Sequence, residues 1–164
     1  MNQAMNKRPA HKLSAHQLSL AVQYASAAQN LPTRAQLRRW VKVALRRDAA
    51  MTLRIVDEAE GRELNKKYRG KDYATNVLTF VYNDGGALCG DVVICAPVAE
   101  REAAAQHRDL FAHYAHLAIH AALHLQGYGH ENGTDAAEME ALETELMLEL
   151  KYSDPYQATR IANG

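Results

Sequence analysis

Long apolar runs are missing from this 164-residue sequence, and cysteine is scarce. No apolar run approaches the ~20 residues that a membrane span needs. The N-terminal segment MNQAMNKRPAHK is polar and lacks the apolar stretch of a secretory signal peptide. The two cysteines, Cys89 and Cys95, lie six residues apart in one predicted strand, which fits neither a zinc ribbon nor a disulfide framework. These absences predict a protein of the reducing cytoplasm that has no membrane partner.

The sequence also has no net charge, with 19 Lys and Arg against 19 Asp and Glu, which by itself argues against nucleic-acid binding. The charges are unevenly distributed. Residues 34–71 hold twelve Lys and Arg against five acids, and residues 131–155 hold eight acids against one lysine. The basic segment could attract phosphate groups. From charge alone, solvated helix faces are the simpler interpretation of both segments.

The length and a hydrophobic content of 48% fit one folded domain with its own core. We expect residues 1–14 to form a flexible leader and residues 157–164 a C-terminal tail. Asp57 and Glu60 resemble a capping box at the start of a helix. Hydrophobic spacing predicts strands at 18–24, 51–56, 76–82 and 88–96, and helices at 34–47, 57–68, 97–107, 109–126 and from 134 or 135 to 150. This pattern predicts a single α+β domain.

Three histidines between residues 120 and 130 have the spacing of a metal site. His120 and His124 are four residues apart, so on a helix they lie on the same face. Gly127 can end that helix in a left-handed turn, after which His130 can return as a third ligand. Three neutral imidazoles leave one tetrahedral position open, which is typical of catalytic zinc. Imidazole ligands also suit nickel, copper or iron.

Neighbouring residues limit the chemistry that this site can perform. His113 and His116 extend the histidine stripe upstream, and we expect them to be supporting or surface groups rather than ligands, because a fourth imidazole would close the open position. Zinc endopeptidases with similar spacing have a glutamate after the first histidine as general base. Here that position is Ala121. A zinc-dependent peptide hydrolase therefore stays only as an alternative.

The histidine segment resembles the signature of the YbeY family of bacterial metal-dependent endoribonucleases, H-G-x-L-H-L-x-G-x-D-H. The matching residues are His120, Leu123, His124, Leu125, Gly127 and His130. The resemblance covers about residues 50–156, and further similar segments stand at 68–72, 75–78, 90–95, 138–143 and 154–156. Two positions depart from the pattern, because Ala121 replaces a glycine and Gly129 replaces an aspartate.

The resemblance implies a YbeY-like catalytic domain over residues 15–156, with about four strands in a small mixed sheet packed with helices. The metal-binding helix is then central and buried. It also implies an endoribonuclease that prefers single-stranded RNA and acts in rRNA maturation and ribosome quality control. The implied partners are rRNA and the small ribosomal subunit. The sequence leaves the oligomeric state open.

Site roles follow from the same resemblance. One zinc ion would be held by His120, His124 and His130, and His120 would also count as catalytic. Arg69 is the candidate for binding the phosphate at the reacting centre, because guanidinium binds phosphate through two parallel hydrogen bonds.

RNA-binding roles are expected for exposed basic and aromatic residues. Lys71, with Lys66 and Lys67, would guide the RNA backbone, and Tyr68 or Tyr128 would stack on an unpaired base. A second alternative is a non-catalytic ribosome-associated factor in which the metal only stabilises the fold.

Overall fold

The computed structural model describes residues 16–82, 86–129 and 133–157. The predicted leader and all but the first residue of the predicted tail lie outside these ranges. No helix in the described ranges is long and apolar enough to cross a membrane. The elements are, in chain order, β1 (Leu18–Ala25), α1 (Arg34–Val43), β2 (Ala49–Val56), α2 (Glu58–Arg69), β3 (Val77–Tyr82), β4 (Leu88–Cys95), α3 (Ala96–Ala105), α4 (Leu110–Leu125) and α5 (Gly133–Glu149).

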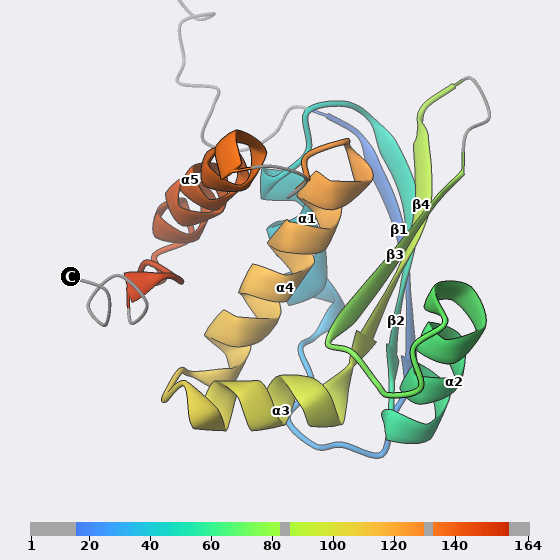
Figure 1. Ribbon diagram of the computed structural model, residues 1–164. Helices are drawn as coiled ribbons and strands as arrows, with labels where there is room; N and C mark the ends of the chain where they lie inside the picture. The colour runs from blue at the N-terminus through green and yellow to red at the C-terminus, as the bar shows by residue number, and fades with distance from the viewer. Residues whose placement is uncertain (1–15, 83–85, 130–132, 158–164) are drawn as a thin grey trace, which may run out of the picture.

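The four strands form one mixed sheet in the order β1-β2-β4-β3 (Figure 1). β1, β2 and β4 are parallel, whereas β3 pairs with β4 in the antiparallel direction at one edge. Val22, Leu53, Val92 and Thr79 stand in register across the sheet. Because side chains alternate between the faces of a strand, this row faces one side and its neighbours face the other. The predicted α+β class with a small mixed sheet is confirmed.

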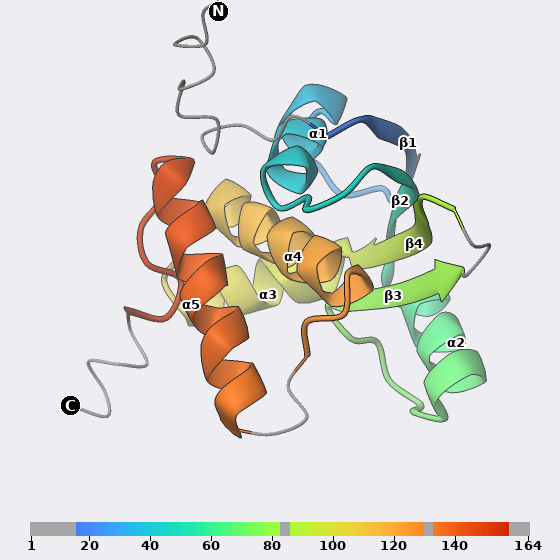
Figure 2. The same ribbon diagram turned by 90° about the horizontal axis from the view of Figure 1, so that it is seen from above.

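Helices cover both faces of the sheet, but unequally. α1 and α4 pack on one face, and α5 lies beyond α4, on its side away from the sheet (Figures 1 and 2). Among the helices that the structure describes, α2 covers the opposite face. The larger core cluster joins Trp40 of α1, Leu53 of β2 and Leu123 of α4, all nearly or completely buried. A smaller cluster under α2 includes Leu78 and Val93.

α4 is the central helix of the molecule, as predicted. Every residue from His113 to Ile119 is buried, and so are those from Ala121 to Leu123. A helix that is apolar on most of its circumference is stable only when neighbours surround it. α1, α3, α5 and the sheet supply those neighbours, so the two described predicted ligands, His120 and His124, stand on a largely enclosed helix.

Gly90 of β4 allows α4 to approach the sheet closely. A Cβ atom added there would lie 2.9 Å from Cδ2 of Leu125 and 3.0 Å from the carbonyl oxygen of Phe80. Both distances are at or below the limit for real Cβ contacts. Glycine therefore sets how close the C-terminal end of the histidine helix lies to β4.

The predicted capping box at the start of α2 is wrong. Asp57 does precede the helix, but its side chain makes no capping hydrogen bond. Its carboxylate instead accepts hydrogen bonds from the hydroxyl of Ser26 and the backbone N–H of Ala27. Glu60 pairs with Arg54 of β2 at 2.7 Å. Tertiary partners outcompete the local motif at both of its positions.

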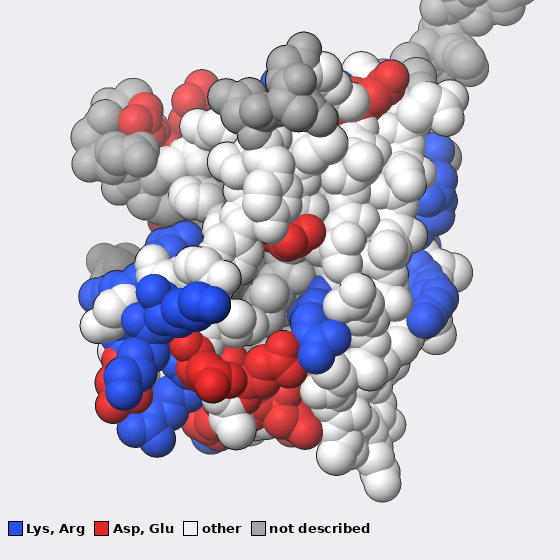
Figure 3. Space-filling model, turned by 90° about the vertical axis from the view of Figure 1, so that its right-hand side faces the viewer, with Lys and Arg blue, Asp and Glu red and all other residues white. Residues whose placement is uncertain are grey.

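The basic segment 34–71 is partly neutralised by nearby acids. Arg54 pairs with Glu60, and Arg62 of α2 pairs with Asp72. Figure 3 shows Lys and Arg beside Asp and Glu over the lower part of the right-hand side of Figure 1, while the upper part of that face is mostly uncharged. This arrangement agrees with the interpretation of the segment as a solvated surface.

Candidate metal centre

His120 and His124 lie on the same face of α4, as their spacing predicts. Their rings are parallel to within 5°, with centroids 6.2 Å apart. The helix ends at Leu125, and Gly127 has a φ of 104°, in the left-handed region. The predicted break after the second histidine is therefore present. His130 lies outside the described residues, so its role as third ligand stays a prediction.

The fully buried carboxylate of Glu143, on α5, forms a hydrogen bond with the imidazole of His120. Nδ1 of His120 lies 2.5 Å from Oε2 of Glu143. Nε2 of His116 lies 3.2 Å from Oε1, and the hydroxyl of Tyr156 donates to the same oxygen. Glu143 thus receives three hydrogen bonds at zero exposure.

The ionisation of Glu143 follows from these contacts. Burial raises the pKa of the carboxyl, but hydrogen bonds from His116 and His120 outweigh burial and lower the pKa to about 2. A carboxylate that is ionised at neutral pH keeps the proton of His120 on Nδ1. The atom that His120 presents to a metal is therefore Nε2, in the carboxylate–histidine–metal arrangement common in metal sites.

Arg108 fixes the tautomers of the two upstream histidines. Its guanidinium lies 3.2 Å from Nδ1 of His113 and 3.3 Å from Nδ1 of His116. Arginine can only donate, so both imidazoles accept at Nδ1 and donate from Nε2. His113 donates to Glu102 at 2.9 Å, and His116 donates to Glu143.

Burial lowers the pKa of two members of this network, His116 and Arg108. Burial lowers the pKa of His116 although the hydrogen bond to Glu143 opposes it, which keeps that imidazole neutral. It also lowers the pKa of Arg108, whose charge is held where water is scarce. Both upstream histidines therefore act in the buried network behind His120, as supporting rather than surface groups.

A cleft of about 370 Å³ opens beside His120. Its walls come from the start of β3, the α3–α4 connection, α4 and the segment after α5. They include Asn76, Arg108, His116 and Tyr156. A polymer or small ligand entering this cleft would meet the edge of the histidine site directly.

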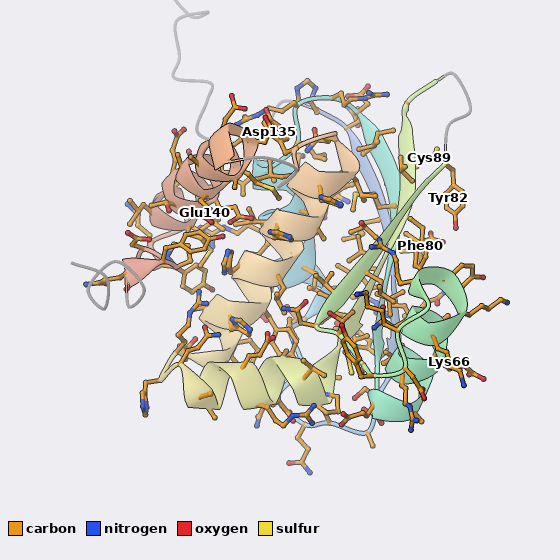
Figure 4. All side chains as sticks on the ribbon, viewed as in Figure 1. Lys66, Phe80, Tyr82, Cys89, Asp135 and Glu140 are labelled. Atoms are coloured by element: carbon orange, nitrogen blue, oxygen red, sulfur yellow. The ribbon has the colours of Figure 1, made fainter. Side chains whose placement is uncertain are left out.

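The predicted RNA-binding residues lie elsewhere. Arg69 is the last residue of α2, and Lys71 follows the left-handed Gly70; all three are exposed. Tyr68 is 54% exposed and packs edge-on against Phe80 at 5.1 Å. α2 covers the sheet face opposite α4, and Figure 4 shows Phe80 turned toward that same side. The described chain therefore separates Arg69, Lys71 and Tyr68 from the histidines by the β3 edge.

The remaining RNA-binding candidates divide between surface and core. Lys66 and Lys67 are exposed near the end of α2, and the ammonium of Lys67 lies 5.2 Å from the ring centre of Tyr68. Tyr128 is half-buried and packs against the main core. A stacking role fits Tyr68 better than Tyr128.

Sequence reasoning did not single out Glu143 and Arg108, whose side chains contact the histidines of α4. One signal was available for Glu143, since it falls on the same stripe of α5 as the buried Met139, Leu146 and Leu150. A carboxylate on an apolar stripe is costly to bury unless hydrogen bonds compensate it. Arg108 gives no such signal, because its contacts depend on how the α3–α4 connection folds.

Two of the three predicted ligands, His120 and His124, are placed where they could share one ion, whereas residues 16–82, 86–129 and 133–157 bring together no group of three possible ligands. Two imidazoles share one helix face, and a buried carboxylate holds one of them through its second nitrogen. The fold and site thus define an α+β protein with a candidate histidine metal centre beside a cleft.

Comparison with known proteins identifies the family. The family model described as Endoribonuclease YbeY matches residues 15–151, and the chain belongs to this family. The endoribonuclease YbeY of Nitrosospira multiformis is 53% identical over 162 residues, covering 90% of this chain and 86% of the relative. That of Aromatoleum aromaticum is 57% identical over 142 residues, covering 85% and 92%.

A solved structure supports the fold alone. The solution structure of a Thermotoga maritima protein has a TM-score of 0.55 and 24% sequence identity, covering 87% of this chain and 93% of that one.

Proposed function

We propose that this chain is a zinc-dependent endoribonuclease that cuts single-stranded RNA during rRNA maturation. Endoribonuclease is the activity named for its family and for relatives more than 50% identical to it. The observation that carries the proposal is the hydrogen bond from Nδ1 of His120 to the buried Glu143, at the rim of a cleft. The peptide-hydrolase alternative is not favoured, because Ala121 occupies the position of the general base.

His120, His124 and His130 would hold the zinc. When bound, zinc acts as a Lewis acid toward a phosphate group or a water molecule. Glu143 holds the proton of His120 on Nδ1, which would leave Nε2 available to a bound ion. His116 and Tyr156 hold Glu143 in turn, through hydrogen bonds to its second oxygen.

Arg69, Lys71 and Tyr68 would bind the RNA away from the histidines. Arg69 offers a guanidinium to a phosphate, Lys71 attracts the backbone, and Tyr68 offers a ring to an unpaired base. Because these residues lie beyond the β3 edge, an RNA strand that reaches both regions must pass around that edge. A flexible single strand can make this turn, whereas a duplex is too stiff to follow it over so short a distance.

The setting that we propose is the cytoplasm, with rRNA and the small ribosomal subunit as partners. This part rests on the resemblance of the motifs to those of the family. A non-catalytic, ribosome-associated factor is the contrasting possibility, and it predicts binding without cleavage.

Cleavage of a labelled single-stranded RNA by the purified, zinc-loaded protein tests the proposal. We expect cleavage that stops on addition of a chelator and is much slower on the matching duplex. Arg69→Ala should weaken RNA binding and slow cleavage at low RNA concentration while keeping its zinc and its fold, and Arg39→Ala, an exposed arginine of α1, serves as control. RNA or ribosome binding by a zinc-loaded protein that cuts no RNA would overturn the enzyme assignment. The ends of the products show the nucleophile, because 2′,3′-cyclic phosphates exclude direct attack by water.

A further inference from the structure

Arg108 lies at the junction of two adjoining hollows on the surface. It lines the cleft of about 370 Å³ beside His120 and also a neighbouring hollow of about 580 Å³. Pro155 lines both as well, and Lys151 lines the second. The two hollows together form a longer path, at one end of which stands the histidine site. An extended polymer needs such a path, whereas a small metabolite needs one pocket.

The charge of Arg108 is not balanced by a carboxylate in direct contact. Within the described ranges, its hydrogen bonds go to the neutral side chains of His113, His116 and Gln106. These bonds use three of the five N–H donors of a guanidinium. Other described arginines in ion pairs, such as Arg101 with Glu58, meet their carboxylate at about 3 Å.

Glu102, the acid in the lining of the cleft, is already engaged. Glu102 accepts hydrogen bonds from His113 at 2.9 Å and from the amide of Asn76 at 3.1 Å. Fixing the tautomers of two histidines does not require a charge, because a neutral amide donates equally well. A half-buried positive charge is costly, so its presence here points to an anion that binds beside it.

We propose that Arg108 binds a backbone phosphate of the RNA, next to the phosphate that reacts at the histidine site. The inference rests on the proposed endoribonuclease function and adds a substrate-positioning contact on the α4 side of the sheet. Guanidinium and phosphate match in charge and in the geometry of paired hydrogen bonds. The cleft falls in the range of about 300–1,000 Å³ that is usual for ligand sites.

Salt-dependent binding of a non-cleavable RNA tests this contact. The probe is a 2′-O-methylated single-stranded oligonucleotide, titrated into the zinc-loaded protein at several salt concentrations. For single strands, each phosphate contact contributes about 0.7 to the slope of log affinity against log salt. Arg108→Gln should lower the slope by about 0.7 and weaken binding roughly tenfold at low salt. Arg108→Lys should keep the slope, and Arg101→Gln, an exposed arginine of α3, should match the wild type.

Each result decides the inference. An Arg108→Gln protein that binds with an unchanged slope overturns it, even if cleavage is lost, because Arg108 then acts only through the histidines. If wild-type protein cuts RNA in that case, the proposed function survives. If wild-type protein neither binds nor cuts RNA, both fall together.

A second measurement covers a variant that does not fold. If Arg108→Gln unfolds, the NMR signal of the Nε–Hε group of Arg108 in wild-type protein is followed instead of the binding of the variant. This signal is assigned by its absence from the spectrum of Arg108→Lys. Addition of the same oligonucleotide should shift this resonance and leave that of Arg101 unchanged. An unshifted Arg108 resonance at saturating RNA overturns the inference.

Discussion

Replacing Glu143 with glutamine separates the charge of this buried side chain from its shape. In the wild type, one carboxylate oxygen accepts from His116 and Tyr156 and the other accepts from His120. An amide has a single acceptor oxygen. If that oxygen stays with His116 and Tyr156, the amide nitrogen meets Nδ1–H of His120, and two donors face each other. His120 must then give up the contact or move its proton to Nε2, the atom needed for the metal.

The magnitude follows from counting these bonds. One charge-assisted hydrogen bond to His120 is lost, at about 1.5–3 kcal/mol. The two hydrogen bonds to the other oxygen no longer involve a charged acceptor and lose about half their strength. Removal of the buried charge also removes its desolvation penalty, which offsets part of this loss. We expect a net loss of about 3 kcal/mol in the free energy of unfolding, or roughly 6–12 °C in Tm for a chain of this size. Loss of an orienting carboxylate should also weaken zinc binding about 10- to 100-fold.

Two measurements on Glu143→Gln check these values. Urea unfolding in the presence of a chelator gives the stability without metal, and competition with a chromophoric chelator gives the zinc affinity. Glu145→Gln, on the exposed side of α5, is the matched control and should change stability by less than about 0.5 kcal/mol. Unchanged zinc affinity in Glu143→Gln would refute the orienting role, whatever happens to stability. Unchanged stability would refute the claim that the three hydrogen bonds to Glu143 stabilise the fold.

Three further predictions test the surroundings of the site. Gly90→Ala places a Cβ 2.9 Å from Leu125 and should lower the free energy of unfolding in urea by about 1–3 kcal/mol. Gly133→Ala, which has open space around it, is the control and should not change the free energy of unfolding. Equal effects of the two substitutions would contradict the close approach of α4 to β4 at Gly90. Burial raises the pKa of Glu102, but hydrogen bonds from His113 and Asn76 outweigh burial and leave the pKa below the usual 4.5. The ionised Glu102 therefore stabilises the folded protein at neutral pH. This contribution is lost as the pH falls below 4.5 toward the lowered pKa. The stability gap between wild type and Glu102→Gln should therefore narrow between pH 7 and pH 3.5, and a constant gap would speak against an ionised Glu102. His124→Ala should lower zinc from one ion per chain to a small fraction by metal analysis and keep its circular dichroism spectrum, because the side chain is exposed; full zinc content would remove His124 from the site.

Elements with strong local signals were predicted well. The hydrophobic period located every described strand and helix to within a few residues, although α1 ends at Val43, four residues before its predicted end. The pairing of His120 and His124 on one face follows from helix geometry alone, so the sequence sufficed. The capping box at Asp57 failed because the segment that follows β1, distant in sequence, supplied a better partner, the Ser26 hydroxyl.

The amino-acid sequence by itself determined the family, the α+β class and the helix that carries the two described histidines, because these depend on spacing along the chain. Only the tertiary structure decided which side chains contact His120 and which line the cleft next to it. Glu143 is 23 residues away and reaches it because α5 packs on α4. Arg108 enters the cleft because the α3–α4 connection turns it there, and Arg69 lies beyond the β3 edge because α2 covers the opposite face. Local spacing fixes which residues share a helix face, whereas contacts between elements depend on packing that no short stretch of sequence encodes.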